Sequence, residues 1–291
     1  MTTILQLIVS GLTVGAIYAL VAVGFTLIYR ASGIFNFAQG EFFMLGGMLA
    51  GIGVASYGLP YPVAALVACV ITVCFGLALF LFGINQARSA SPIQLLILTI
   101  GASLLARGLA SAILGKDFVR LPQLMPWDVW RVGGVVIQTQ ALVIILGAFL
   151  IVSVMGYFLS RALTGKAIVA IAANTVGAQL MGINRVAVVS LCFALSALIG
   201  ALGGILATPI TLTSYDTGVM LAIKGFTGAM LGGTGKSYGP VLGGLLVGLL
   251  EAFGAGFISS VYKDALALVV LLLVFALFPQ GIFASRSVER V

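Results

Sequence analysis

The sequence contains no histidine, and charged residues account for only 7% of its 291 positions. It also lacks a nucleophile–base pair, paired carboxylates and a cluster of metal-ligand side chains, so we predict no catalytic residue, no metal site and no cofactor bound by this chain. The three cysteines, Cys69, Cys74 and Cys192, lie inside apolar runs, where we expect them to pack as small apolar side chains. These absences predict that the protein is not an enzyme.

No hydrophilic segment is long enough to form a separate soluble domain, because 62% of the residues are hydrophobic and the mean hydropathy is +1.25. A soluble domain cannot keep so much apolar surface out of water, whereas a lipid bilayer can hold it. A spanning helix needs roughly 20 apolar residues. We therefore predict one all-α polytopic membrane domain over residues 1–291. Its expected spans are about nine: 4–28, 37–57, 61–84, 92–114, 138–160, 186–208, 217–234, 239–259 and 264–280.

The first apolar segment lacks a basic n-region and is too long for the apolar core of a signal peptide, so it is expected to be a retained span. Basic residues are scattered singly at span ends, which argues against nucleic-acid binding despite a net charge of +7. If residues 161–185 face the cytoplasm, that side holds eight Lys and Arg residues and the other side four. The excess of basic residues predicts an external N-terminus and a cytoplasmic C-terminus.

A faint internal repeat runs through the chain. The four residues Met44–Gly47 recur as Met230–Gly233, and in both halves a long span precedes a short, glycine-rich one. Inverted repeats around short, interrupted spans are typical of transport folds. We predict that residues 4–114 and 186–280 form such a repeat, with coincidence among 38 glycines as the alternative.

Arg107, Lys224 and Glu251 fall inside predicted spans. A charge facing lipid costs at least about 2.5–3.5 kcal/mol, so these side chains should face the protein interior, a water-filled path or a subunit contact. Lys224 and Glu251 lie at similar helical distances from the turn that joins their spans and are expected to pair.

The segment 36–41 opens the second span with polar residues, either as a helix cap or as a polar break lining a cavity. The candidate residues of a translocation path are Asn36, Gln39, Glu41, Lys224, Thr227 and Glu251.

Residues 232–237 look like a phosphate-binding loop, but Met230 stands where that pattern needs a glycine, and the segment joins two apolar spans. We interpret it as a tight turn. Any ATP hydrolysis must therefore come from another protein.

The segment 161–185 is too polar to span a bilayer and too patterned to be a slack linker. We predict short helices at the boundary between membrane and cytoplasm. An amphipathic helix resting on lipid is one interpretation. The low charge and many alanines favour docking into a groove of a partner protein. Its patchy apolar face comprises Ile168, Ile171, Val176, Leu180 and Met181.

Three motifs carry a resemblance that covers nearly the whole chain. They are GIFNFAQGEFFMLGGM at 33–48, TGKAIVAIAANTVGAQLMGIN at 164–184 and GGTGKSYGPVLGG at 232–244. With them the chain resembles the permease family of branched-chain amino acid ABC importers, in particular the smaller of the two paired membrane subunits. The resemblance implies a second permease subunit, two cytoplasmic ATPase subunits that use ATP and Mg, and an external solute-binding protein. It also implies alternating access in a bacterial inner membrane.

In this family the internal loop is the segment that couples the permease to the ATPase. The resemblance implies that role here for Gly165, Lys166, Ile171, Ala172, Asn174, Ala178, Met181 and Gly182. The chain departs from the family at Ile168 and Ile171, where many members carry arginines, so its docking contacts differ in detail.

Two other functions remain open from the sequence. One is an ABC permease for another small polar solute, such as urea or an amide, a sugar or a nucleoside. The other is a secondary transporter or channel that works alone, which would need an ion relay that the few buried charges do not supply. The sequence does not identify the substrate or show whether the partner permease is a second copy.

Overall fold

The computed structural model describes residues 2–87, 90–123, 129–132, 134–233, 238–259, 263–277 and 281–282. In these ranges the chain is helical apart from one antiparallel hairpin and short turns. The elements are α1 (Thr2–Ser32), α2 (Gln39–Ala55), α3 (Tyr61–Ala78) continued by a π-helical segment (Leu79–Ile84), α4 (Pro92–Ile113), β1 (Val129–Val132), β2 (Val135–Gln138), α5 (Thr139–Arg161), α6 (Leu163–Ala173), α7 (Thr175–Leu180), α8 (Arg185–Thr211), α9 (Thr217–Gly232), α10 (Gly239–Phe257) and α11 (Lys263–Leu277).

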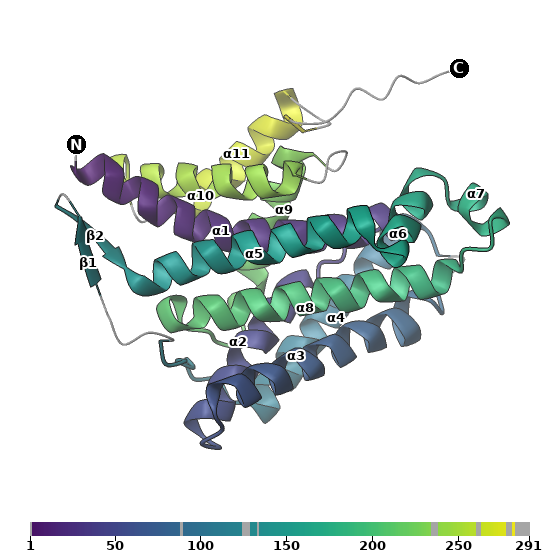
Figure 1. The fold of residues 1–291 in the computed structure, drawn as a ribbon, viewed down its shortest axis with the longest axis horizontal. Coiled ribbons are helices and arrows are strands. Elements are labelled where there is room, and N and C mark those ends of the chain that lie inside the picture. Colours follow the sequence, from purple (N-terminus) through teal and green to yellow (C-terminus); the bar gives the residue numbers. More distant parts are fainter. Residues whose placement is uncertain are drawn as a thin grey trace.

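The long helices lie side by side along the long axis of the molecule (Figure 1). Within the described residues, six helices are long and apolar enough to cross a membrane: α1, α3 with its π-helical segment, α4, α5, α8 and α10. Each of the other three predicted spans also contains a helix, but α2, α9 and α11 have only 17, 16 and 15 residues. The all-α membrane fold is confirmed, and nine crossings stay a prediction.

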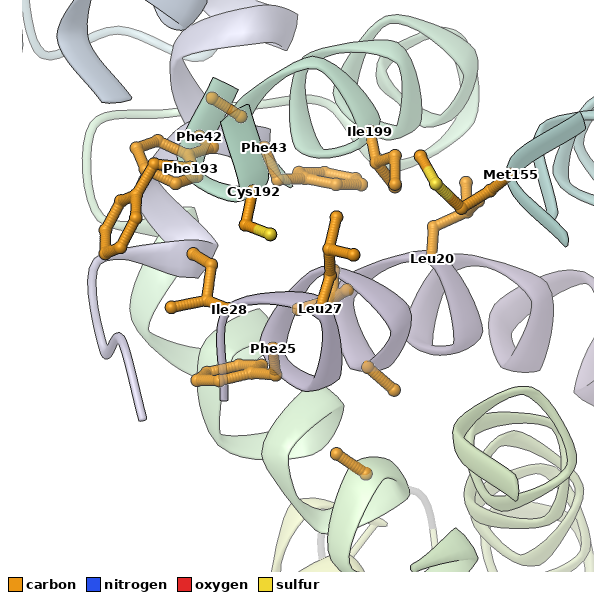
Figure 2. Packing of buried hydrophobic residues seen from close by; sticks show 14 of the residues in the cluster. Leu20, Phe25, Leu27, Ile28, Phe42, Phe43, Met155, Cys192, Phe193 and Ile199 are labelled. Atoms are coloured by element: carbon orange, nitrogen blue, oxygen red, sulfur yellow. The ribbon is translucent and has the colours of Figure 1, made fainter. Parts of the chain in front are cut away.

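Helix α1 is the centre of the bundle because its small residues let neighbouring backbones approach. Gly15 lies against Gly248 of α10, and Ala19 lies against Gly244, with no room for a Cβ on either α10 glycine. Helices in lipid gain little from hydrophobicity, so such close contact contributes much of the packing. On its other side α1 packs against α2 and α8 through large apolar side chains, with Leu20, Ile28, Phe42, Phe193 and Ile199 among them (Figure 2).

Helices α2 and α9 cross each other at their first turns. Gly40 is the second residue of α2 and Gly218 the second residue of α9, and a Cβ on Gly40 would collide with the carbonyl of Gly218. The repeated Met-Leu-Gly-Gly motif does not occupy equivalent positions in the two helices, because it lies in the middle of α2 but at the C-terminal end of α9. The inverted repeat therefore stays a prediction. Gly40 and Gly218, each the second residue of its helix, relate the two halves better than the motif does.

Candidate functional site

Helices α6 and α7 project at one end of the bundle, opposite the N-terminus and the β1–β2 hairpin (Figure 1). Ile168 and Ile171 of α6 are 2% exposed and pack into the main core. Gly165 lies so close to the carbonyl of Phe158 in α5 that a Cβ would not fit. The sequence thus predicted these helices correctly, but two of the five residues of their apolar face anchor them to the bundle.

The other three residues of the apolar face point outward. Val176, Leu180 and Met181 are 67%, 83% and 85% exposed. Asn174 caps the N-terminus of helix α7, where its side chain accepts a hydrogen bond from the backbone N–H of Gly177 at 2.8 Å. We call Val176, Leu180 and Met181 the α7 tip; an exposed apolar cluster of this kind marks an interaction site more often than a free surface.

The eight residues that the resemblance assigned to coupling divide between two surfaces. Gly165, Ile171 and Ala178 are buried against the chain itself. The exposed ones are Lys166, Ala172, Asn174, Met181 and Gly182. Gly182 has φ +84°, a conformation that favours glycine and ends the segment with a sharp turn. Whether any of the eight contacts an ATPase stays a prediction.

An open groove of about 510 Å³ lies beside α6, between the end of α1 and the start of α8. Arg30 and Arg185 line it together with Val169 and Ala172, and no acidic side chain does among the described residues that form it. The structure therefore places these two basic residues at the same end as α6 and α7, as the charge count requires.

Lys224 and Glu251 form the ion pair that the sequence predicted, with Nζ and Oε1 2.9 Å apart. The structure adds two partners that sequence reasoning missed. Asp264 Oδ1 of α11 lies 2.6 Å from Lys224 Nζ, and the Tyr18 hydroxyl of α1 donates to Glu251 Oε2 at 2.7 Å. Lys224 Nζ also lies 5.4 Å from the centre of the Tyr18 ring. This four-residue network joins α1, α9, α10 and α11.

The polar residues before and within the first turns of α2 form a separate buried group. Asn36, Gln39 and Glu41 are all 0% exposed. The hydroxyl of Ser196 in α8 lies 2.5 Å from Gln39 Oε1, and Gln39 Nε2 donates to the Ser196 carbonyl at 3.3 Å. Gln39 thus joins α2 to α8.

Glu41 faces α4. Its Oε1 accepts a hydrogen bond from Ser103 at 2.8 Å and lies 3.5 Å from Arg107 Nε. Arg107 therefore faces a buried carboxylate, as expected of a charge within a span. The remaining path candidate, Thr227, donates to the carbonyl of Ile223 in its own helix at 2.9 Å. Contact of any candidate with a substrate stays a prediction.

Comparison with known proteins identifies the family. The family model described as "Branched-chain amino acid transport system / permease component" matches residues 7–275. The chain belongs to this permease family.

Curated relatives cover almost the full length of the permease. It is 33% identical over 300 residues to "High-affinity branched-chain amino acid transport system permease protein BraD" of Pseudomonas aeruginosa, covering 99% of this chain and 98% of the relative. It is 32% identical over 302 residues to the corresponding permease protein LivH of Escherichia coli K12, covering 99% and 97%.

A solved structure shares the fold of the permease. A chain of PsaBC from Streptococcus pneumoniae in complex with Fab superposes with a TM-score of 0.51 at 13% identity, covering 93% of this chain and 91% of that chain. At this identity the likeness speaks for the fold alone.

Proposed function

We propose that this permease is the membrane-spanning subunit of an ATP-driven ABC importer for branched-chain or related amino acids. The family match and the full-length similarity to BraD and LivH support this assignment. The partners in this proposal are a second permease subunit, two cytoplasmic ATPases that use ATP and Mg, and an external binding protein that delivers the substrate.

The α7 tip is the observation that carries the coupling role. It combines high exposure with apolar chemistry at the end of the molecule that bears Arg30 and Arg185. The positive-inside rule assigns that end to the cytoplasm and the N-terminus to the outside. There an apolar tip would be exposed to water unless another protein or the lipid surface covers it, and the low charge of the segment favours a protein.

The contacts of the projecting helices support a mechanism of alternating access. Helix α6 packs against both α5 and α1, so a movement imposed on α7 by an ATPase reaches the central helix of the bundle. The proposal includes nine crossings and two inverted repeats that meet where α2 and α9 cross. Packed bundles change between discrete arrangements, which suits a two-state mechanism.

Copurification tests this proposal. The double variant Leu180→Ala with Met181→Ala should recover much less ATPase subunit than the wild type while the permease still reaches the membrane. The matched control is Leu146→Ala with Leu150→Ala on α5, where the two leucines are 66% and 62% exposed. Equal ATPase recovery by all three proteins would remove the coupling role.

Reconstitution tests the transport class. Leucine uptake into proteoliposomes should require ATP, the ATPases and the binding protein. Uptake by the isolated permease driven by an ion gradient would instead establish a secondary transporter. Substitution of Ala178 by a bulky residue is a poorer test, because its side chain is 6% exposed and packs inside the protein.

A further inference from the structure

Helix α4 has one face with almost no neighbours and one face packed against α2. A Cβ added to Gly101 or Gly108 would meet no atom of the described chain within 4 Å, and Leu104 and Leu105 are 58% and 60% exposed. Arg107 lies on the opposite, packed side of the helix with Ser103 and Ala110, and its side chain is 26% exposed. A guanidinium facing lipid costs at least about 2.5–3.5 kcal/mol. Arg107 avoids this cost by facing the buried carboxylate of Glu41.

The Arg107–Glu41 pair is incomplete. The Nε of Arg107 is buried and makes no hydrogen bond to any described residue, because the nearest carboxylate oxygen is 3.5 Å away. Glu41 is 0% exposed, and its Oε2 also makes no hydrogen bond within the described part of the chain. Buried charged groups without hydrogen bonds are costly, so both groups are suited to receive a further partner.

The surroundings favour a partner that carries both charges. Glu41 Oε2 lies against Gly218 in the first turn of α9, near the positive end of that helix dipole. A charged carboxylate accepts hydrogen bonds from an ammonium group. A guanidinium binds a carboxylate through two parallel hydrogen bonds.

An apolar cluster adjoins this charged pair. Met44 and Met48 of α2 contact Ala110 of α4, and both methionines are 0% exposed. Met44 and Ala110 each follow the charged residue of their own helix by three positions, so they lie on the same helix faces about one turn away. Methionine side chains adapt their shape to different apolar groups.

We propose that Glu41, with Ser103, and Arg107 form the subsite that binds the α-ammonium and α-carboxylate groups of an amino acid as it crosses the permease. The Met44–Met48–Ala110 cluster receives its apolar side chain when α4 shifts away from α2. The outward face of α4 at Gly101 and Gly108 meets no described atom, which leaves room for that shift. The inference rests on the proposed function, because the subsite needs a transported amino acid, which carries both an ammonium and a carboxylate group.

The test uses the complete transporter without its binding protein. Binding of leucine is measured in competition with 4-methylpentanoate, which lacks the ammonium group, and with isoamylamine, which lacks the carboxylate. We expect the wild type to bind leucine at millimolar concentration and to prefer it to either analogue by roughly tenfold or more. Failure of the wild type to bind leucine under these conditions would overturn the proposal.

The variants should change selectivity in opposite ways. Glu41→Gln should remove the preference for leucine over 4-methylpentanoate and keep the preference over isoamylamine, and Arg107→Gln should do the reverse. Arg107→Lys keeps the charge but loses the paired hydrogen bonds, so it should weaken only carboxylate recognition. Thr72→Val on α3, whose hydroxyl bonds its own helix, is the control.

A purely structural ion pair, or one completed by water, would give a different result. Glu41→Gln and Arg107→Gln would then weaken leucine and both analogues by one common factor, and the proposal would be wrong. ATP-driven leucine uptake by the wild type with its binding protein is measured in parallel. Its absence would count against the proposed function, whereas normal uptake with a common-factor loss would refute only the subsite.

Discussion

Removal of Lys224 should destabilise the permease far more than neutralisation of its partner Glu251. The Lys224→Met variant removes the cation that Glu251 and Asp264 share, and the side chain of Glu251 is only 10% exposed. Breaking a buried pair in this way costs about 3–5 kcal/mol. In Glu251→Gln, Lys224 keeps Asp264 at 2.6 Å and the Tyr18 hydroxyl can still donate to the new amide oxygen. The Glu251→Gln variant should therefore lose only about 1 kcal/mol of unfolding free energy.

Unfolding of the purified protein by denaturing detergent measures both losses on one scale. Thr227→Val is a matched control on α9, since that hydroxyl bonds only its own helix among the described contacts. Equal destabilisation by Lys224→Met and Glu251→Gln would refute the reasoning, because it would mean that Asp264 does not share the cation.

The same network limits a charge exchange between the two residues. Lys224→Glu with Glu251→Lys restores an ion pair but places the new glutamate beside Asp264 and the new lysine beside the donating Tyr18 hydroxyl. Activity lost in either single reversal should therefore return only in part. Adding Asp264→Asn should improve the recovery, as transport in proteoliposomes would record, and no gain from this third change would count against the network.

Two further predictions concern packing. Gly40→Val should lower the thermal unfolding temperature strongly, because the new side chain meets the backbone of Gly218. The control Gly156→Ala on α5 has open space around it within the described chain and should be tolerated. Equal effects of the two variants would refute the close crossing of α2 and α9. Gln6→Ala should remove two hydrogen bonds to the backbone of Val136, at 2.8 and 3.0 Å, and speed amide hydrogen exchange in the β1–β2 hairpin. The free energy of unfolding should fall by less than about 1 kcal/mol. Unchanged exchange would show that other contacts hold the hairpin.

The apolar runs predicted nearly every helix, because a bilayer leaves the backbone few other ways to satisfy its hydrogen bonds. The same reasoning found α6 and α7, since residues 161–185 break the apolar pattern without losing helical periodicity. It could not separate the anchoring Ile168 and Ile171 from the exposed Leu180 and Met181. That division depends on which face of each short helix meets α1 and α5.

The candidate site shows the same limit. The energetic cost of a charge that faces lipid was enough to predict that Lys224 pairs with Glu251, because both lie in spans joined by one short turn. Nothing in the linear pattern linked Tyr18 to Glu251, which is 233 positions away, or Glu41 to Ser103 and Arg107. No spacing rule applies to residues on helices that are distant in the chain.

The sequence alone therefore determined that the chain is a helical membrane protein with a polar helical segment between its spans, because composition and periodicity fix how a chain meets lipid, and its motifs predicted the permease family. The tertiary structure decided which polar residues share a site. Their partners are set by the close crossings of α1, α2, α9 and α10, where glycines let backbones touch, and those crossings depend on three-dimensional packing across the whole bundle.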